Sequence, residues 1–176
     1  MTDDSKDHGR HMDKRIRQYL GLISAIMAYY LIHEGAHLLY AFYIGAFKQI
    51  NFIGLGVQID VYAEKMTSTQ MGIFCILGSV ATTIISYLLV ALTDKIGQSP
   101  SNVFKACMYY ITIALLLIDP LYLSILCGFF GGGDMNGISL LVPEIAARIS
   151  YGALLSINMI VFFKIVLPKY KLAFNH

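Results

Sequence analysis

Four stretches of the chain carry almost no charged side chains, and each is long enough to cross a lipid bilayer. They cover residues 19–47, 71–92, 106–130 and 143–167. The hydrocarbon core of a bilayer requires about 20 apolar residues of helix, so we expect four transmembrane helices. Hydrophobic residues make up 57% of the chain and charged residues 14%, whereas a soluble domain carries roughly 25% charged residues. This composition excludes a soluble enzyme, a disordered chain and a nucleic-acid-binding protein.

Lysine and arginine residues are distributed unequally around these stretches. Most lie before the first stretch, between the second and third, or around the end of the fourth, as Lys14, Arg15, Arg17, Lys95, Lys105, Lys164, Lys169 and Lys171. The first loop holds Lys48 and Lys65, and the third holds Arg148. Because cytoplasmic loops are enriched in basic residues, we expect both termini in the cytoplasm. So small a chain favours an integral protein of a prokaryotic plasma membrane, embedded in the lipid bilayer and without a nucleic-acid partner.

The first residues of the chain differ from the rest. Residues 1–11 are polar and without hydrophobic period, and the pair His11-Met12 resembles a junction left by cloning. We therefore expect residues 1–11 to be an added or disordered tail, and residues 12–176 to form one membrane-embedded domain.

The loop after the first apolar stretch alternates polar and apolar residues over 49–52 and again over 57–62. A period of two residues is typical of a half-buried strand. Gly54 and Gly56 lie between the two segments and suit a turn. The pattern predicts a short β-hairpin at the membrane face, and an irregular loop is the alternative.

Residues 33–37 read His-Glu-Gly-Ala-His and lie in the middle of the first apolar stretch. On a helix, positions i and i+4 share one face, so His33 and His37 can bind one metal ion. Zinc accepts two imidazoles and a carboxylate and keeps a fourth position for water. The ion would acidify that water, Glu34 would accept its proton, and hydroxide would attack a carbonyl. A knot of hydrogen bonds between helices is the alternative, but it does not account for the spacing.

Such a site requires a third protein ligand, for which Asp134 and Asp119 are the candidates. Asp134 lies in a segment, residues 131–137, with four glycines in seven residues, which disfavours a regular helix. Non-helical backbone within a membrane is tolerated where it is buried in protein or lines a wet cavity. We therefore prefer Asp134 as the ligand over an ordinary loop acid. Asn136 can donate a hydrogen bond to a substrate or a ligand, although Asn before Gly also suits a plain turn.

Asp119 precedes Pro120 inside the third apolar stretch. Proline removes one helical hydrogen bond and kinks the helix, and a carboxylate within a membrane segment favours a functional role. Three roles remain open for Asp119. It can support a ligand histidine, serve as the third ligand itself, or bind backbone N–H groups freed at the kink.

The arrangement resembles the site-2 protease family of intramembrane zinc metalloproteases. The first stretch reads His33-Glu34-x-x-His37 with small residues at positions 41 and 45, and Phe52-x-Gly54-x-Gly56 follows it. In that family such a helix is followed by a membrane-associated β-hairpin. The second stretch has Gly78 where the family has a Gly-Pro pair, but the proline and a nearby asparagine are missing.

The resemblance implies one zinc ion per chain, bound by His33, His37 and Asp134, with Glu34 as the catalytic residue. Asp134 matches the aspartate of the family's Asp-Gly motif, although Met135 follows it here. The expected fold is an all-α polytopic membrane protein with about four transmembrane helices, a hairpin after the first and a glycine-broken segment before the last. Asn136, Asp119, Gly54 and Gly56 are candidates for substrate binding or support of the ligands.

The expected function is hydrolysis of a peptide bond in or near the transmembrane segment of another membrane protein. The alternative is a zinc-binding membrane protein without proteolytic activity, either a degenerate protease or a metal-handling protein. Glu34 argues against this alternative, because a protein that only holds zinc has no use for a general base.

Overall fold

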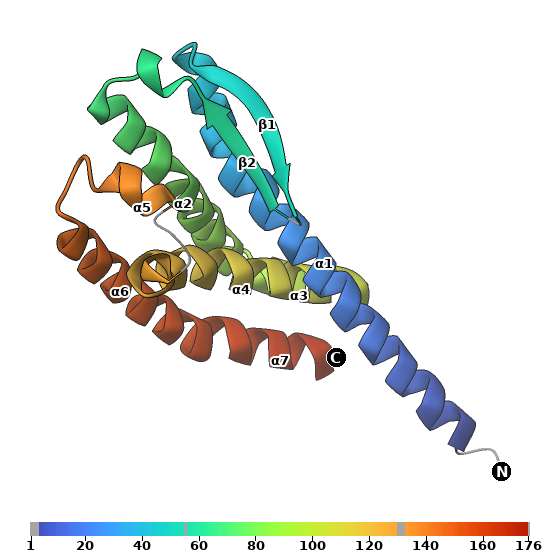
Figure 1. Cartoon of the computed structure of the whole chain (residues 1–176). Coiled ribbons are helices and arrows are strands. Elements are labelled where there is room, and N and C mark those ends of the chain that lie inside the picture. Colours follow the sequence, from blue (N-terminus) through green and yellow to red (C-terminus); the bar gives the residue numbers. More distant parts are fainter. Residues whose placement is uncertain (1–3, 55, 130–132, 176) are drawn as a thin grey trace.

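The computed structural model describes residues 4–54, 56–129 and 133–175, and within them four helices are long and apolar enough to cross a membrane (Figure 1). These four spans are Lys14–Tyr43, Ser68–Ala91, Asn102–Ser124 and Glu144–Asn175, and they overlap the four apolar stretches of the sequence. The prediction of four long apolar helices is therefore confirmed.

In chain order the elements are α1 (Asp4–Tyr43), β1 (Phe47–Ile53), β2 (Gly56–Val61), a 3-10 turn (Ala63–Lys65), α2 (Ser68–Ala91), α3 (Thr93–Gly97), α4 (Asn102–Ser124), a second 3-10 turn (Leu126–Gly128), α5 (Gly133–Ile138), α6 (Glu144–Val161), a π-helical turn (Phe162–Val166) and α7 (Leu167–Asn175).

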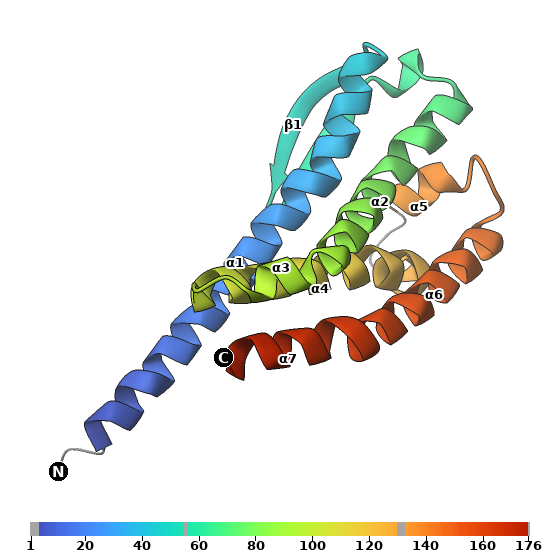
Figure 2. The same ribbon diagram turned by 180° about the vertical axis from the view of Figure 1, so that it is seen from behind.

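Helix α1 packs against α2 and α4, and α4 packs in turn against α6. The N-terminal part of α1 extends beyond the other helices in both views (Figures 1 and 2). This helix begins at Asp4, so residues 4–11 lie within it; residues 1–3 lie outside the described residues, and an added or disordered tail over 1–11 stays a prediction. Close packing of α1 on α4 depends on Gly21, because a Cβ there would collide with the ring of Tyr110.

Strands β1 and β2 form an antiparallel hairpin, as the alternating pattern predicted. Gly54 lies in the turn with a φ of +61°, a conformation that favours glycine. The register pairs Ile50 with Ile59 and Phe52 with Val57, so these apolar residues share one face of the hairpin. The hairpin folds back along the C-terminal half of α1 (Figure 1). Ile59 is buried there and joins the main hydrophobic core.

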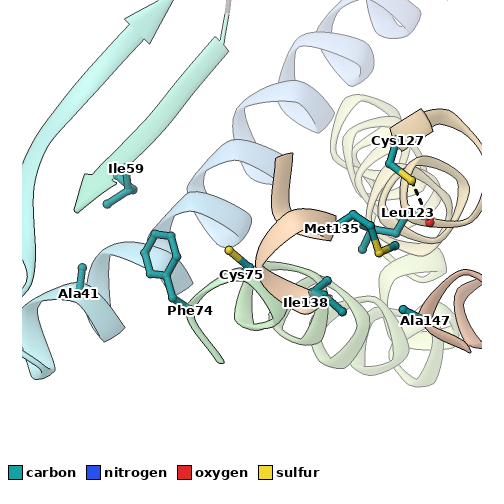
Figure 3. Packing of buried hydrophobic residues seen from close by; sticks show 9 residues of the cluster. All are labelled: Ala41, Ile59, Phe74, Cys75, Leu123, Cys127, Met135, Ile138 and Ala147. Carbon is teal, nitrogen blue, oxygen red and sulfur yellow. Dashed lines mark hydrogen bonds between the residues drawn. The ribbon is translucent and has the colours of Figure 1, made fainter. Parts of the chain in front are cut away.

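The main core joins every long helix to the hairpin and to the short helix α5 (Figure 3). Its buried members are Ala41, Ile59, Phe74, Cys75, Leu123, Cys127, Met135, Ile138 and Ala147. Met135 and Ile138 bury α5 in this core, and Gly137 allows α5 to approach α2 because a Cβ there would collide with Cys75 Sγ. The expectation that the glycines would prevent a regular helix is thus wrong from Gly133 onward, where burial outweighs their low helix propensity.

Helix α4 continues through Pro120 and ends at Ser124. Because proline has no N–H, the carbonyl of Leu116 loses its helical donor. The side chain of Asn158 on α6 replaces that donor, with Nδ2 lying 2.6 Å from Leu116 O. The hydroxyl of Tyr87 on α2 donates to Asn158 Oδ1 at 2.8 Å. A buried asparagine therefore repairs the break in α4 and links it to α2 and α6.

Replacing Asn158 by Leu should leave Leu116 O buried without a donor and should lower the free energy of unfolding by about 1–3 kcal/mol. In a Pro120→Ala background the same replacement should cost less, because the restored N–H at position 120 can bond to Leu116 O. Unfolding in detergent micelles, followed for the two single variants and the double variant, measures this coupling. An equal cost in both backgrounds would contradict the repair of α4 by Asn158.

Candidate metal centre

The two histidines of the HExxH motif lie on one face of α1 and point into the protein. His33 is 7% exposed and His37 is 3% exposed. Asp134, near the start of α5, approaches both from the other side, and ligand atoms of the three residues all lie within 4.8 Å of one another. The structure therefore brings together the three residues that the sequence favoured as metal ligands.

The separations between these ligand atoms suit a small metal ion. Asp134 Oδ2 lies 3.1 Å from His33 Nε2 and 3.5 Å from His37 Nε2. Two ligands bound tetrahedrally to zinc at its usual bond lengths lie about 3.3 Å apart. The Asp134 carboxylate is therefore at a suitable distance to share one ion with both imidazoles.

The other nitrogen of each ring already has an acceptor. His33 Nδ1 lies 3.2 Å from the carboxylate of Asp119, and His37 Nδ1 lies 2.7 Å from the backbone carbonyl of Phe74. An acceptor at Nδ1 favours a proton on that nitrogen, and an ion bound by Asp134 would then meet the lone pair of each Nε2.

Space for an ion depends on Gly78 of α2. A Cβ at this position would lie 2.6 Å from His37 Nε2 and 2.7 Å from His33 Nε2. Any side chain at Gly78 would thus enter the region that both donor nitrogens face. The donor set and this opening together fit a metal ion of the kind that two imidazoles and a carboxylate bind.

The carboxyl of Asp134 is suited to act as an anionic ligand. Its Oδ2 faces the Nε2 atoms of both histidines, at 3.1 Å and 3.5 Å, so it can share an ion with them. Its position follows from the packing of α5, because Met135 and Ile138 on either side of Gly137 are buried against α2.

Glu34 projects from α1 about 100° away from the neighbouring His33. It lines an apolar groove of about 790 Å³ between α1 and the hairpin. The backbone amide of Ile59 on β2 interacts with its carboxylate. The other groove residues are Ser24, Ile26, Met27, Ala28, Tyr30, Leu31, Gly35, Leu38, Ile50, Val57 and Ile59. Glu34 is therefore next to the histidines in sequence and faces an open apolar surface.

The remaining candidates from the sequence lie outside the three-residue cluster. Asp119 contacts Nδ1 of His33, on the side of the ring away from Asp134, so it supports a ligand in this geometry. Asn136 is exposed on α5. Gly54 and Gly56 belong to the turn region of the hairpin, and the described groove lining includes neither.

Sequence reasoning missed three contributors to this site, namely the carbonyl of Phe74 and the hydroxyls of Tyr29 and Thr82. The two hydroxyls bind the carboxylate of Asp119. A signal for Thr82 was present, since Ser79, Thr82 and Ser86 form a polar stripe on an otherwise apolar helix. A backbone carbonyl leaves no such signal.

Comparisons of the chain with protein-family models, with curated proteins and with solved structures found no match.

Replacing Gly78 by Ala should block metal binding, because the new methyl carbon would lie 2.6–2.7 Å from both Nε2 atoms and would displace the rings or α2. We expect at least a tenfold loss of zinc affinity, measured by competition with a chromophoric chelator, and a zinc content well below one per chain. Gly152→Ala on α6 is the matched control, because a Cβ there meets nothing closer than Ser124 Cβ at 3.8 Å. Normal zinc binding by the Gly78→Ala protein would show that the ion does not lie between the histidines.

Proposed function

We propose that this chain is an intramembrane zinc metalloprotease, as its resemblance to the site-2 protease family implies. The observation that carries the proposal is the convergence of His33, His37 and Asp134 on one point, with Glu34 beside them at an open groove. A site that only held helices together would not need two Nε2 atoms that converge on one carboxylate, with an opening made by Gly78 beside them.

The distribution of polarity supports a location inside a bilayer. On α1, Leu31 and Leu39 are 77% and 74% exposed, whereas His33 and His37 between them are buried. Soluble proteins place apolar residues inside and charged residues outside, and this helix does the reverse. Lipid would cover the exposed leucines. Four spans would bring both chain ends to the same side, as the distribution of basic residues predicts.

The chemistry that the site can perform is the hydrolysis of an amide. A zinc ion held by His33, His37 and Asp134 would supply Lewis acidity to a water molecule and to the scissile carbonyl. The carboxylate of Glu34 accepts a proton from the attacking water and later passes it to the leaving amine. The elements of one water molecule are added across the C–N bond, so neither an oxidant nor a second substrate is required.

The groove between α1 and the hairpin is a suitable place for the substrate. A transmembrane helix hides its carbonyl groups in hydrogen bonds, so it must unwind before attack. The groove has an apolar lining for the side chains of such a segment, and the edge of a two-stranded hairpin can bind its backbone as an added strand. Ile59 of the hairpin contacts Glu34, so a strand bound there would lie close to the proposed general base.

Glu34→Gln should retain one zinc ion per chain and lose cleavage of a model single-span substrate in proteoliposomes. The amide keeps the shape of the side chain but cannot accept a proton, so we expect a decrease of at least 100-fold. A chelator should abolish cleavage by the wild type, and added zinc should restore it. Retained cleavage by Glu34→Gln would remove Glu34 from the mechanism, and zinc binding without any cleavage by the wild type would favour the non-proteolytic alternative.

Gly35→Leu should obstruct the groove without disturbing the metal. Gly35 lines the groove beside Glu34, and a Cβ there would meet no atom within 4 Å. We expect kcat/KM for the same substrate to fall at least tenfold while the zinc content is unchanged. Gly35→Ala is the control and should stay within about threefold of wild type. If the leucine variant cleaves normally, the substrate does not bind in this groove.

A further inference from the structure

We propose that Asp119 is a positioning residue that holds His33 in the geometry for metal binding and that Tyr29 and Thr82 hold Asp119. The inference rests on the metal site of the proposed function and goes beyond it, because Asp119 donates no atom to the cluster of His33, His37 and Asp134.

The carboxylate of Asp119 is almost completely buried, with 1% of the residue exposed. Its partners are three side chains on other helices. His33 Nδ1 lies at 3.2 Å, the hydroxyl of Tyr29 at 2.5 Å and the hydroxyl of Thr82 at 2.5 Å. Among the described residues, no lysine or arginine forms an ion pair with it. A buried anion is costly unless donors surround it, and here the donors are two hydroxyls and an imidazole.

The hydrogen bond to Asp119 controls one of the two metal-binding rings. When the carboxylate accepts a hydrogen bond from Nδ1–H of His33, the Nε2 lone pair is available to a metal ion. The carboxylate also makes the imidazole a more basic metal ligand. The ring of Tyr29 also stacks on His33, with 5.2 Å between ring centroids. His37 has the neutral carbonyl of Phe74 as its partner, so loss of Asp119 should act on the metal through His33 alone.

Charge balance gives a second reason for a carboxylate at this position. A divalent cation beside Asp134 alone would keep an uncompensated positive charge in an apolar surrounding, which is unfavourable. Asp119 provides a second negative charge one imidazole away from the ion. An asparagine would accept the same hydrogen bond from His33 but would not provide this charge, so the two effects can be separated by substitution.

The position of Asp119 is fixed by the repaired break in α4. Asp119 directly precedes Pro120. The side chain of Asn158 donates a hydrogen bond to the carbonyl of Leu116, which lacks a helical donor because of the proline. This turn of α4 is therefore tied to α6 through Asn158 and to α1 and α2 through Asp119. A carboxylate on a turn of α4 that is tied to three other helices can keep a histidine ring at one angle.

The test compares zinc affinity and the visible spectrum of the cobalt-substituted protein among variants. Asp119→Asn should lower zinc affinity 10- to 100-fold and shift the cobalt bands, because a neutral amide replaces the carboxylate behind His33. Tyr29→Phe and Thr82→Val should each lower the affinity several-fold with the carboxylate still present. Tyr151→Phe is the matched control. It removes a part-buried 2.6 Å hydrogen bond between α6 and Ser79 of α2, and it should change neither readout.

Wild-type affinity and an unchanged cobalt spectrum in Asp119→Asn would overturn the inference. So would complete loss of zinc from Asp119→Asn together with retention by Asp134→Ala, since Asp119 would then be a ligand. If Asp119→Asn does not fold, unchanged affinity in both Tyr29→Phe and Thr82→Val overturns the inference. Failure of the wild type to bind zinc at all would instead refute the proposed function, so the two failures are distinguishable.

Discussion

Two imidazoles buried four residues apart on an apolar helix require partners, and each neighbouring element supplies one. Helix α2 contributes the carbonyl of Phe74 to His37, and α4 contributes Asp119 to His33. Helix α5 contributes Asp134 to the face where the two remaining nitrogens meet. An unpaired imidazole would be costly in such a surrounding, so these contacts also determine how the helices pack around α1.

Residues without side-chain donors are as important to this packing as the polar groups. Gly78 brings α2 close to the histidines while leaving the space between them open. Gly137 lets α5 approach α2 at Cys75, and this approach delivers Asp134 to the site. Pro120 breaks one hydrogen bond of α4, and Asn158 repairs it from α6. The glycines and the proline disfavour a helix locally, but each of these positions permits a contact between elements. Such local conflicts are common where a site is assembled from several helices.

The sequence was sufficient for the features that depend on local pattern. Long stretches without charge predicted the four helices, alternation over 49–52 and 57–62 predicted the hairpin, and the HExxH spacing predicted that His33 and His37 share one face. The sequence was insufficient for the features that depend on how the helices pack against one another. The helix of α5 forms among glycines because Met135 and Ile138 are buried, which no local pattern reveals. The role of Asp119 stayed open because it depends on how α4 packs against α1 and α2.

The order of residues in the HExxH motif gives α1 two faces with different surroundings. One face carries His33 and His37, and the other carries Glu34 and Gly35. Consecutive residues of a helix point about 100° apart, so Glu34 projects to the side of the face that carries His33 and His37. The histidines face α2, α4 and α5, where rigid packing fixes the donor atoms. Glu34 and Gly35 face the groove beneath the hairpin, where the wall is apolar and open. In the proposed protease, the metal site would benefit from rigid surroundings, whereas the proton acceptor would have to meet a substrate that enters and leaves. One helix can satisfy both requirements because a single residue step separates the two faces.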